Sequence, residues 1–219
     1  MPHVDVTSTR PYTPSSPAAD WAIRLARCVA GLAMFGLGIS LLIEAHLGAA
    51  PWDVFHQGLA ELTGISVGNV IVGVGVLLLV LWIPLRQRPG VGTLLNALEI
   101  GITVDLIMPL IPDTDVVALR ALELVAGIVV VAIGSGLYIG SGLGAGPRDG
   151  LMIGLGRLGL SVRAARTLIE VTVLIAGRAL GGTIGIGTVA FTLGIGPLVH
   201  VFLPRLALPP RRAPVTVPA

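Results

Sequence analysis

The sequence predicts an all-α polytopic membrane protein of about six transmembrane helices, arranged as two inverted three-helix repeats. Each repeat is expected to carry one further short helix, either interfacial or re-entrant. Three observations support this fold class: the composition, the lengths of the apolar stretches and an internal duplication. Hydrophobic residues make up 54% of the 219 residues and charged residues only 12%, about half the share that is typical of a soluble domain. So few charges could not solvate a surface in water, so the surface is expected to face lipid.

Six apolar stretches approach the roughly 20 residues that a helix needs to cross the hydrocarbon core. They are 21–43, 66–83, 91–111, 116–138, 162–180 and 184–203. The fifth is the weakest candidate, because Arg166, Glu170 and Arg178 lie on it. Segments 51–62 and 147–158 are too short to span and are expected to form the interfacial or re-entrant helices.

The two ends of the chain are rich in proline and small polar residues, a composition typical of disordered tails. We therefore expect disordered cytoplasmic tails at 1–20 and 205–219, a first membrane repeat at 21–112 and a second at 113–204.

The arginines predict how the chain lies in the membrane. All fourteen basic residues are arginine, which in a chain rich in Ala, Gly and Val is typical of a GC-rich bacterial genome. Twelve of the fourteen fall on one side if both termini are cytoplasmic, and only Arg120 and Arg178 fall on the other. This asymmetry follows the positive-inside rule. It predicts a multi-pass protein of the bacterial cytoplasmic (inner) membrane with both termini inside.

A duplication relates the two halves of the chain. Residues 47–53 (LGAAPWD) match residues 143–149 (LGAGPRD) at five of seven positions, at an offset of 96. After one deletion the offset becomes 95, so that Ser66 matches Ser161 and Ile100 matches Ile195. Because each half holds three spans, an odd number, the second half must enter the membrane upside down. Inverted repeats of this kind are found in many secondary transporters.

The segment GAAPWD at 48–53, its copy at 144–149 and the three-span halves resemble the YczE-like family of bacterial membrane proteins, which is related in pattern to YitT-type proteins. The resemblance covers nearly the whole chain between the tails. It implies a fold and a membrane location, and no established activity.

The half-helix N-termini at Pro51 and Asp53, and at Pro147 and Asp149, are the first candidate site. Proline suits the first turn of a helix, and an acidic residue two positions later meets the positive end of the helix dipole. One interpretation is therefore simple helix capping. The other is that both helices begin at a central binding site, where the carboxylates favour a cation or an amine over a bare anion.

Polar residues inside the spans give a second candidate, a substrate, proton or cation site at Asn96, Glu99 and Glu170. Asn96 and Glu99 share a helix face because they are three residues apart. An ionised Glu99 at mid-membrane is costly unless it is paired or hydrated, so it is either functional or half of a buried pair. Arg166 precedes Glu170 by four residues, which favours an ion pair between these two side chains.

Other kinds of site are not indicated. Glu44, His46, Asp53 and His56 match no metal-ligand spacing, and Cys28 is the single cysteine, so neither a metal nor an intrachain disulfide is expected. Enzyme motifs are missing as well. Residues 140–145 (GSGLGA) match the dinucleotide-binding pattern G-x-G-x-x-A, but no strand precedes them and no βαβ unit is expected, so nucleotide binding is not indicated. We therefore predict no enzyme, no cofactor and no nucleic-acid partner.

Two functions are compatible with these features. The leading hypothesis is a small-solute transporter or permease with its site between the repeats, and the alternative is a non-transporting membrane accessory or assembly factor. The expected partners are the lipid bilayer and a small solute or ion. The glycine-rich apolar exterior is also compatible with a homodimer.

Overall fold

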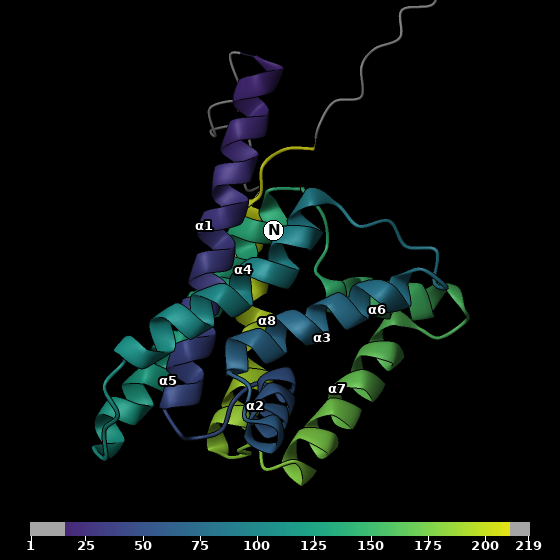
Figure 1. Ribbon diagram of the computed structural model, residues 1–219. Coiled ribbons are helices and arrows are strands. Elements are labelled where there is room, and N and C mark those ends of the chain that lie inside the picture. Colours follow the sequence, from purple (N-terminus) through teal and green to yellow (C-terminus); the bar gives the residue numbers. More distant parts are fainter. Residues whose placement is uncertain (1–15, 211–219) are drawn as a thin grey trace, which may run out of the picture.

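The computed structural model describes residues 16–210, in which every regular element is a helix (Figure 1). The helices are α1 (Pro17–Glu44), α2 (Pro51–Thr63), α3 (Val67–Trp82), α4 (Val91–Ile107), the 3₁₀ turn η2 (Met108–Leu110), α5 (Val117–Gly140), α6 (Pro147–Arg157), α7 (Val162–Ala179) and α8 (Ile186–Leu206). The all-α prediction is thus confirmed for the described part of the chain.

Only some of the six expected spans are long and apolar enough to cross a bilayer. Within residues 16–210, α1, α4 with η2, α5 and α8 qualify, and α2 and α3 qualify only as a pair that is bent by 112°. Alone, α3 has 16 residues. α7 does not qualify, because four charged residues interrupt it: Arg163, Arg166, Glu170 and Arg178. The described residues therefore contain four or five candidate spans.

The first and last helices extend into the segments expected to be tails. α1 begins at Pro17, where the Ser16 side chain accepts a hydrogen bond of 3.1 Å from the backbone N–H of Ala19. This N-cap stabilises the first turn, so residues 17–20 are helical. α8 likewise continues to Leu206. Residues 1–15 and 211–219 of the predicted tails lie outside the described residues.

The two short helices begin where the proline pattern predicted. α2 starts at Pro51 and α6 at Pro147, each after a residue in an extended conformation and each with an aspartate in its first turn. The ring of a first-turn proline costs no hydrogen bond, because that N–H would have no partner within the helix.

The long helices α1 and α5 cross at glycines. A Cβ atom added to Gly31 would lie 2.8 Å from the carbonyl oxygen of Gly134, and one added to Gly38 would lie 2.9 Å from that of Gly127. Gly31 corresponds to Gly127 in the duplication, and Gly38 corresponds to Gly134. The two contacts are therefore reciprocal, and only glycine permits the backbones to come so close.

Two loop contacts repeat this reciprocity. The carbonyl of Leu143 accepts a hydrogen bond of 2.9 Å from the N–H of Gly92, and the carbonyl of Leu47 accepts one of 2.7 Å from the N–H of Gly187. The glycines after the two leucines have φ values of +99° at Gly48 and +137° at Gly144, a conformation that side chains disfavour. Each loop thus tethers the start of a helix from the opposite half of the chain.

The short helices α2 and α6 pack in equivalent ways in the two halves, whereas the pairs α3–α4 and α7–α8 do not. α2 packs against α7, and α6 packs against α3. However, α3 packs along α4, whereas α7 is not packed along α8 in the same way. In Figure 1, α7 accordingly lies at the edge of the molecule, with α8 nearer the centre.

Candidate functional site

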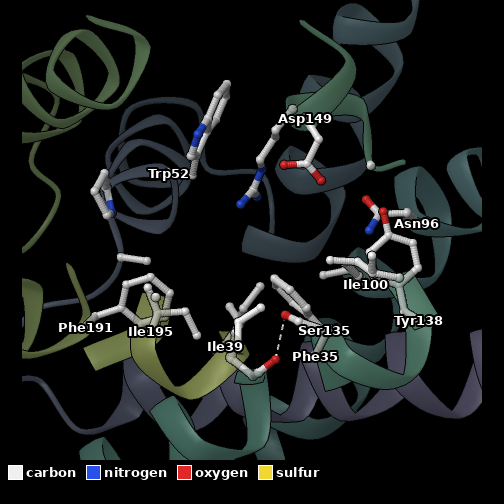
Figure 2. A pocket seen from close by; sticks show the side chains of 18 of the residues that line it. Phe35, Ile39, Trp52, Asn96, Ile100, Ser135, Tyr138, Asp149, Phe191 and Ile195 are labelled. Atoms are coloured by element: carbon white, nitrogen blue, oxygen red, sulfur yellow. Dashed lines mark hydrogen bonds between the residues drawn. The ribbon is translucent and has the colours of Figure 1, made fainter. Parts of the chain in front are cut away.

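A cavity of about 440 Å³ lies between the two halves of the chain and is lined by residues of α1, α2, α4, α5, α6, α7 and α8. Figure 2 shows Trp52, Asn96, Tyr138 and Asp149 along one wall of this cavity. Along the opposite wall lie the apolar side chains Phe35, Ile39, Phe191 and Ile195. Its volume lies in the range of small-molecule sites, which are mostly apolar with a few placed polar groups.

The N-termini of α2 and α6 meet at the polar wall. The guanidinium carbon of Arg148 lies 5.0 Å from the centroid of the Trp52 ring, within the range of a cation–π interaction. Nη2 of Arg148 lies 3.9 Å from Oδ1 of Asp53, too far for a hydrogen bond. Trp52 and Arg148 occupy the same position of the duplicated motif. This is the one position of the motif at which the two halves differ in charge, and its two residues contact each other directly.

Several buried polar atoms beside this contact have no hydrogen-bond partner among the described residues: Asp53 Oδ1, Trp52 Nε1 and the Tyr138 hydroxyl. Asp53 and Tyr138 are each only 2% exposed. Both ring nitrogens of the buried His56 are also unpaired, with Nδ1 3.6 Å from Asp53 Oδ1. Because an unsatisfied buried polar group costs about 1–3 kcal/mol, such a cluster is suited to hydrogen-bonding a ligand or water.

The structure brings five of the seven predicted site residues together in the cavity and leaves Pro147 and Glu99 outside it. Asn96, Glu170, Pro51, Asp53 and Asp149 line the cavity. Pro147 instead lines a small pocket of about 20 Å³, and its carbonyl accepts a hydrogen bond of 2.9 Å from Nε1 of Trp82. Glu99 lines neither space. The expected Arg166–Glu170 pair is formed, with Nε donating to Oε1 over 2.8 Å.

Arg148 lines the cavity but was not among the site residues predicted from the sequence. Its charge was counted among the cytoplasmic arginines that set the orientation, whereas the side chain lines the cavity. A signal was available, because the residue stands in the duplicated motif directly before Asp149.

The centre of the cavity is built from pairs of duplicated positions. These pairs are Phe35 and Val131, Ile39 and Ser135, Ala50 and Gly146, Trp52 and Arg148, Asp53 and Asp149, Asn96 and Phe191, and Ile100 and Ile195. Both halves therefore contribute equivalent positions to the centre.

Away from this centre the further lining residues belong almost entirely to the second half, and most of them lie on α7 and α8. The side chains there include Arg166 and Glu170 of α7 and Val199, His200 and Leu203 of α8. Their counterparts on α3, α4 and η2 are Ile71, Gly75, Val104, Asp105 and Met108, and none of these lines the cavity. Ile71 and Gly75 line the 20 Å³ pocket instead. The equivalent space between α3 and α4 is thus nearly closed.

Asp105 joins α3 to α4 on the closed side. Its Oδ2 accepts a hydrogen bond of 2.6 Å from the Ser66 hydroxyl, and its Oδ1 accepts one of 2.8 Å from the N–H of Gly68. We call these three residues the Asp105 latch. The counterparts of Asp105 and Gly68 are His200 and Arg163. The α7–α8 side therefore has no carboxylate with which to form the same contact.

Comparisons with known proteins identify the family. Residues 22–204 match the model of a family of unknown function, DUF6198. The chain belongs to this family. It is 35% identical to the uncharacterized membrane protein YczE of Bacillus subtilis over 179 residues, which are 80% of this chain and 83% of YczE. It is 36% identical to an uncharacterized protein of Haemophilus influenzae over 177 residues, which are 80% of this chain and 81% of the relative.

These relatives confirm the YczE-like resemblance and the membrane location. Neither the family nor the relatives carry an enzymatic description. No solved structure matches the chain.

Proposed function

We propose that the protein is a small-solute transporter of the bacterial inner membrane that binds its solute in the central cavity. In this proposal the two halves are inverted repeats, both termini are cytoplasmic, and the protein is not an enzyme. The observation that carries the proposal is the asymmetry of the cavity. Its centre is made of equivalent positions from both halves, but the rest of its lining belongs mostly to α7 and α8 of the second half.

The reciprocal contacts support the inverted repeat. Gly31 lies against Gly134 as Gly38 lies against Gly127, and the loop of each half binds the helix start of the other. Equivalent positions that exchange partners in this way are expected when a two-fold axis relates the halves. An odd number of membrane crossings per half would place that axis in the membrane plane.

The orientation of the arginines assigns a side to the opening. The cavity extends between the beginning of α7 and the end of α8, where Arg163 and Arg205 lie. The positive-inside rule puts such residues in the cytoplasm. In our proposal the structure is therefore an inward-open state, and the Asp105 latch closes the outer side.

A second state follows from the same symmetry. In this second state each half would take the arrangement that the other half has now. α7 would then pack along α8, and α3 would separate from α4. The cavity would then open to the outside. Gating of one repeat against the other around a fixed site is how many inverted-repeat transporters work. The cost is a break in the Asp105 latch, whose carboxylate bonds are worth about 1.5–3 kcal/mol each.

Labelling of a cysteine in the cavity tests this proposal. We expect that Ile195→Cys, in a Cys28→Ser background, reacts with a membrane-impermeant thiol reagent from both sides of the membrane. Ile195 lines the centre of the cavity, so water reaches it from each side in turn if the two states exchange. Labelling is measured in right-side-out and inside-out vesicles.

Val76→Cys in the same background is the control, because Val76 is an exposed apolar residue of α3 that we expect to face lipid and to stay unlabelled. Labelling of Ile195→Cys from the cytoplasmic side alone would contradict transport. That result would favour the alternative, a non-transporting accessory protein.

A further inference from the structure

Arg148 offers the cavity an unused set of hydrogen-bond donors. Its guanidinium stacks on Trp52 and lies 3.9 Å from Asp53, and among the described residues it makes no hydrogen bond. Nε1 of Trp52 and the hydroxyl of Tyr138 are unpaired donors that line the same cavity. A guanidinium binds a carboxylate with two parallel hydrogen bonds. This part of the wall therefore suits the carboxylate of a ligand.

Asp53 and Asp149 offer the complementary charge. Oδ1 of Asp53 accepts no hydrogen bond although the residue is only 2% exposed, and both aspartates line the cavity. An ammonium group supplies the donors that such an acceptor lacks. This part of the wall therefore suits an amine.

The overall charge of the wall decides between an anion, a cation and a zwitterion. Arg148 faces two aspartates, so these three side chains together carry one excess negative charge when ionised. The N-termini of α2 and α6 each contribute about half a positive charge, which offsets that excess. Arg166 and Glu170 neutralise each other. A bare anion would meet the two carboxylates and a bare cation would meet Arg148, whereas a zwitterion satisfies both.

The side chains of the opposite wall indicate the chemical character of the rest of the ligand. Phe35 and Ile39 of α1 face the polar wall together with Phe191 and Ile195 of α8 (Figure 2). Burying apolar surface against these side chains is favourable by about 25 cal/mol per Å². The ligand should therefore carry an aliphatic or aromatic body next to its charged end.

We propose that the cavity binds a zwitterionic solute with an apolar body, of the class of the apolar amino acids. Its carboxylate lies on Arg148 and its ammonium group on Asp53 and Asp149, and its side chain lies against Phe35 and Phe191. This inference rests on the proposed function, since it names the solute of the same cavity.

Three matched compounds test the proposal on the purified full-length protein. L-Leucine carries both charges, isopentylamine lacks the carboxylate and 4-methylpentanoate lacks the amine. We expect leucine to raise the thermal unfolding midpoint and to bind in calorimetry. Each one-charge analogue should bind about tenfold or more weakly, because it leaves a charged side chain of the cavity wall without a partner. If either analogue binds as tightly as leucine, or if neither leucine nor phenylalanine binds at millimolar concentration, the proposal is wrong.

Two variants assign the charges to residues. Arg148→Gln should lose leucine binding but not weaken isopentylamine, whereas Asp149→Asn should lose leucine binding but not weaken 4-methylpentanoate. The two have opposite signatures, so a misfolded variant, which would lose every ligand, is recognised. Glu99→Gln is the control and should bind leucine as the natural protein does, because Glu99 lies outside the cavity. Equal loss of all three compounds in folded variants would overturn the assignment.

The labelling of Ile195→Cys needs no ligand, so it separates this proposal from the proposed function. Two-sided labelling without leucine binding would reject the zwitterion and keep transport. One-sided labelling with leucine binding would reject transport and keep the site.

Discussion

Gly31→Ala is expected to lower the thermal unfolding midpoint by about 10 °C, because the added methyl group separates α1 from α5. A Cβ atom at Gly31 would lie 2.6 Å from the backbone nitrogen of Tyr138 and 2.8 Å from the carbonyl oxygen of Gly134. Both are backbone atoms of α5, so no side-chain rotation can relieve the contact. Thermal unfolding of the detergent-purified protein, followed by its retention in the monodisperse fraction, measures the effect.

Gly73→Ala is the matched control for this prediction. Gly73 lies on α3, and nothing would lie within 4 Å of a Cβ atom there. Alanine is favoured over glycine in a helix by about 1 kcal/mol, so the midpoint should stay constant or rise. Gly134→Ala, on the other side of the crossing, should behave like Gly31→Ala. Equal midpoints for the Gly31 and Gly73 variants would show that the crossing is not close-packed.

Asp105→Ala is expected to accelerate labelling of Ile195→Cys from the outer side by about tenfold or more. The substitution removes both hydrogen bonds of the Asp105 latch. Loss of about 1.4 kcal/mol or more from the inward-open state corresponds to a tenfold shift in population. Labelling from the cytoplasmic side should slow, because the outward-open state becomes more populated. The two labelling rates, measured in oppositely oriented vesicles, check this prediction.

Asp115→Ala provides the comparison for the latch. Asp115 is a fully exposed carboxylate before α5 that contacts Arg120, and it is expected on the same side of the membrane. Its loss should change neither rate. If Asp105→Ala accelerated labelling from both sides, the substitution would have loosened the whole protein, and the latch would not be a gate.

Local features of the fold could be predicted because they depend on local chemistry. The starts of α2 and α6 follow from proline in the first turn with an aspartate two residues later. The apolar stretches became helices, since a chain in lipid must satisfy its backbone hydrogen bonds internally. The duplication placed Asp53 and Asp149 at equivalent positions, and both line one cavity.

The sequence could not predict which side of each helix points into the protein. The polar and apolar residues of α4 are not separated onto two faces, so the pattern does not show which face points inward. Asn96 lines the cavity and Glu99 lies outside it. The same limit hid Arg148, because a count of charges does not say where an arginine side chain points. The unequal packing of α3–α4 and α7–α8 does not follow from the repeat, which predicts equal packing in both halves.

Distances between paired spin labels test the exchange of the two halves most directly. One pair, on Ala164 and Arg205, spans the open side between α7 and α8, and the equivalent pair, on Asn69 and Leu110, spans the closed side between α3 and α4. All four residues are exposed. In a Cys28→Ser background, pulsed electron paramagnetic resonance should give a long distance for the first pair and a short one for the second. Asp105→Ala should shorten the first and lengthen the second together. A single unchanged distance for each pair would contradict alternating access between inverted repeats.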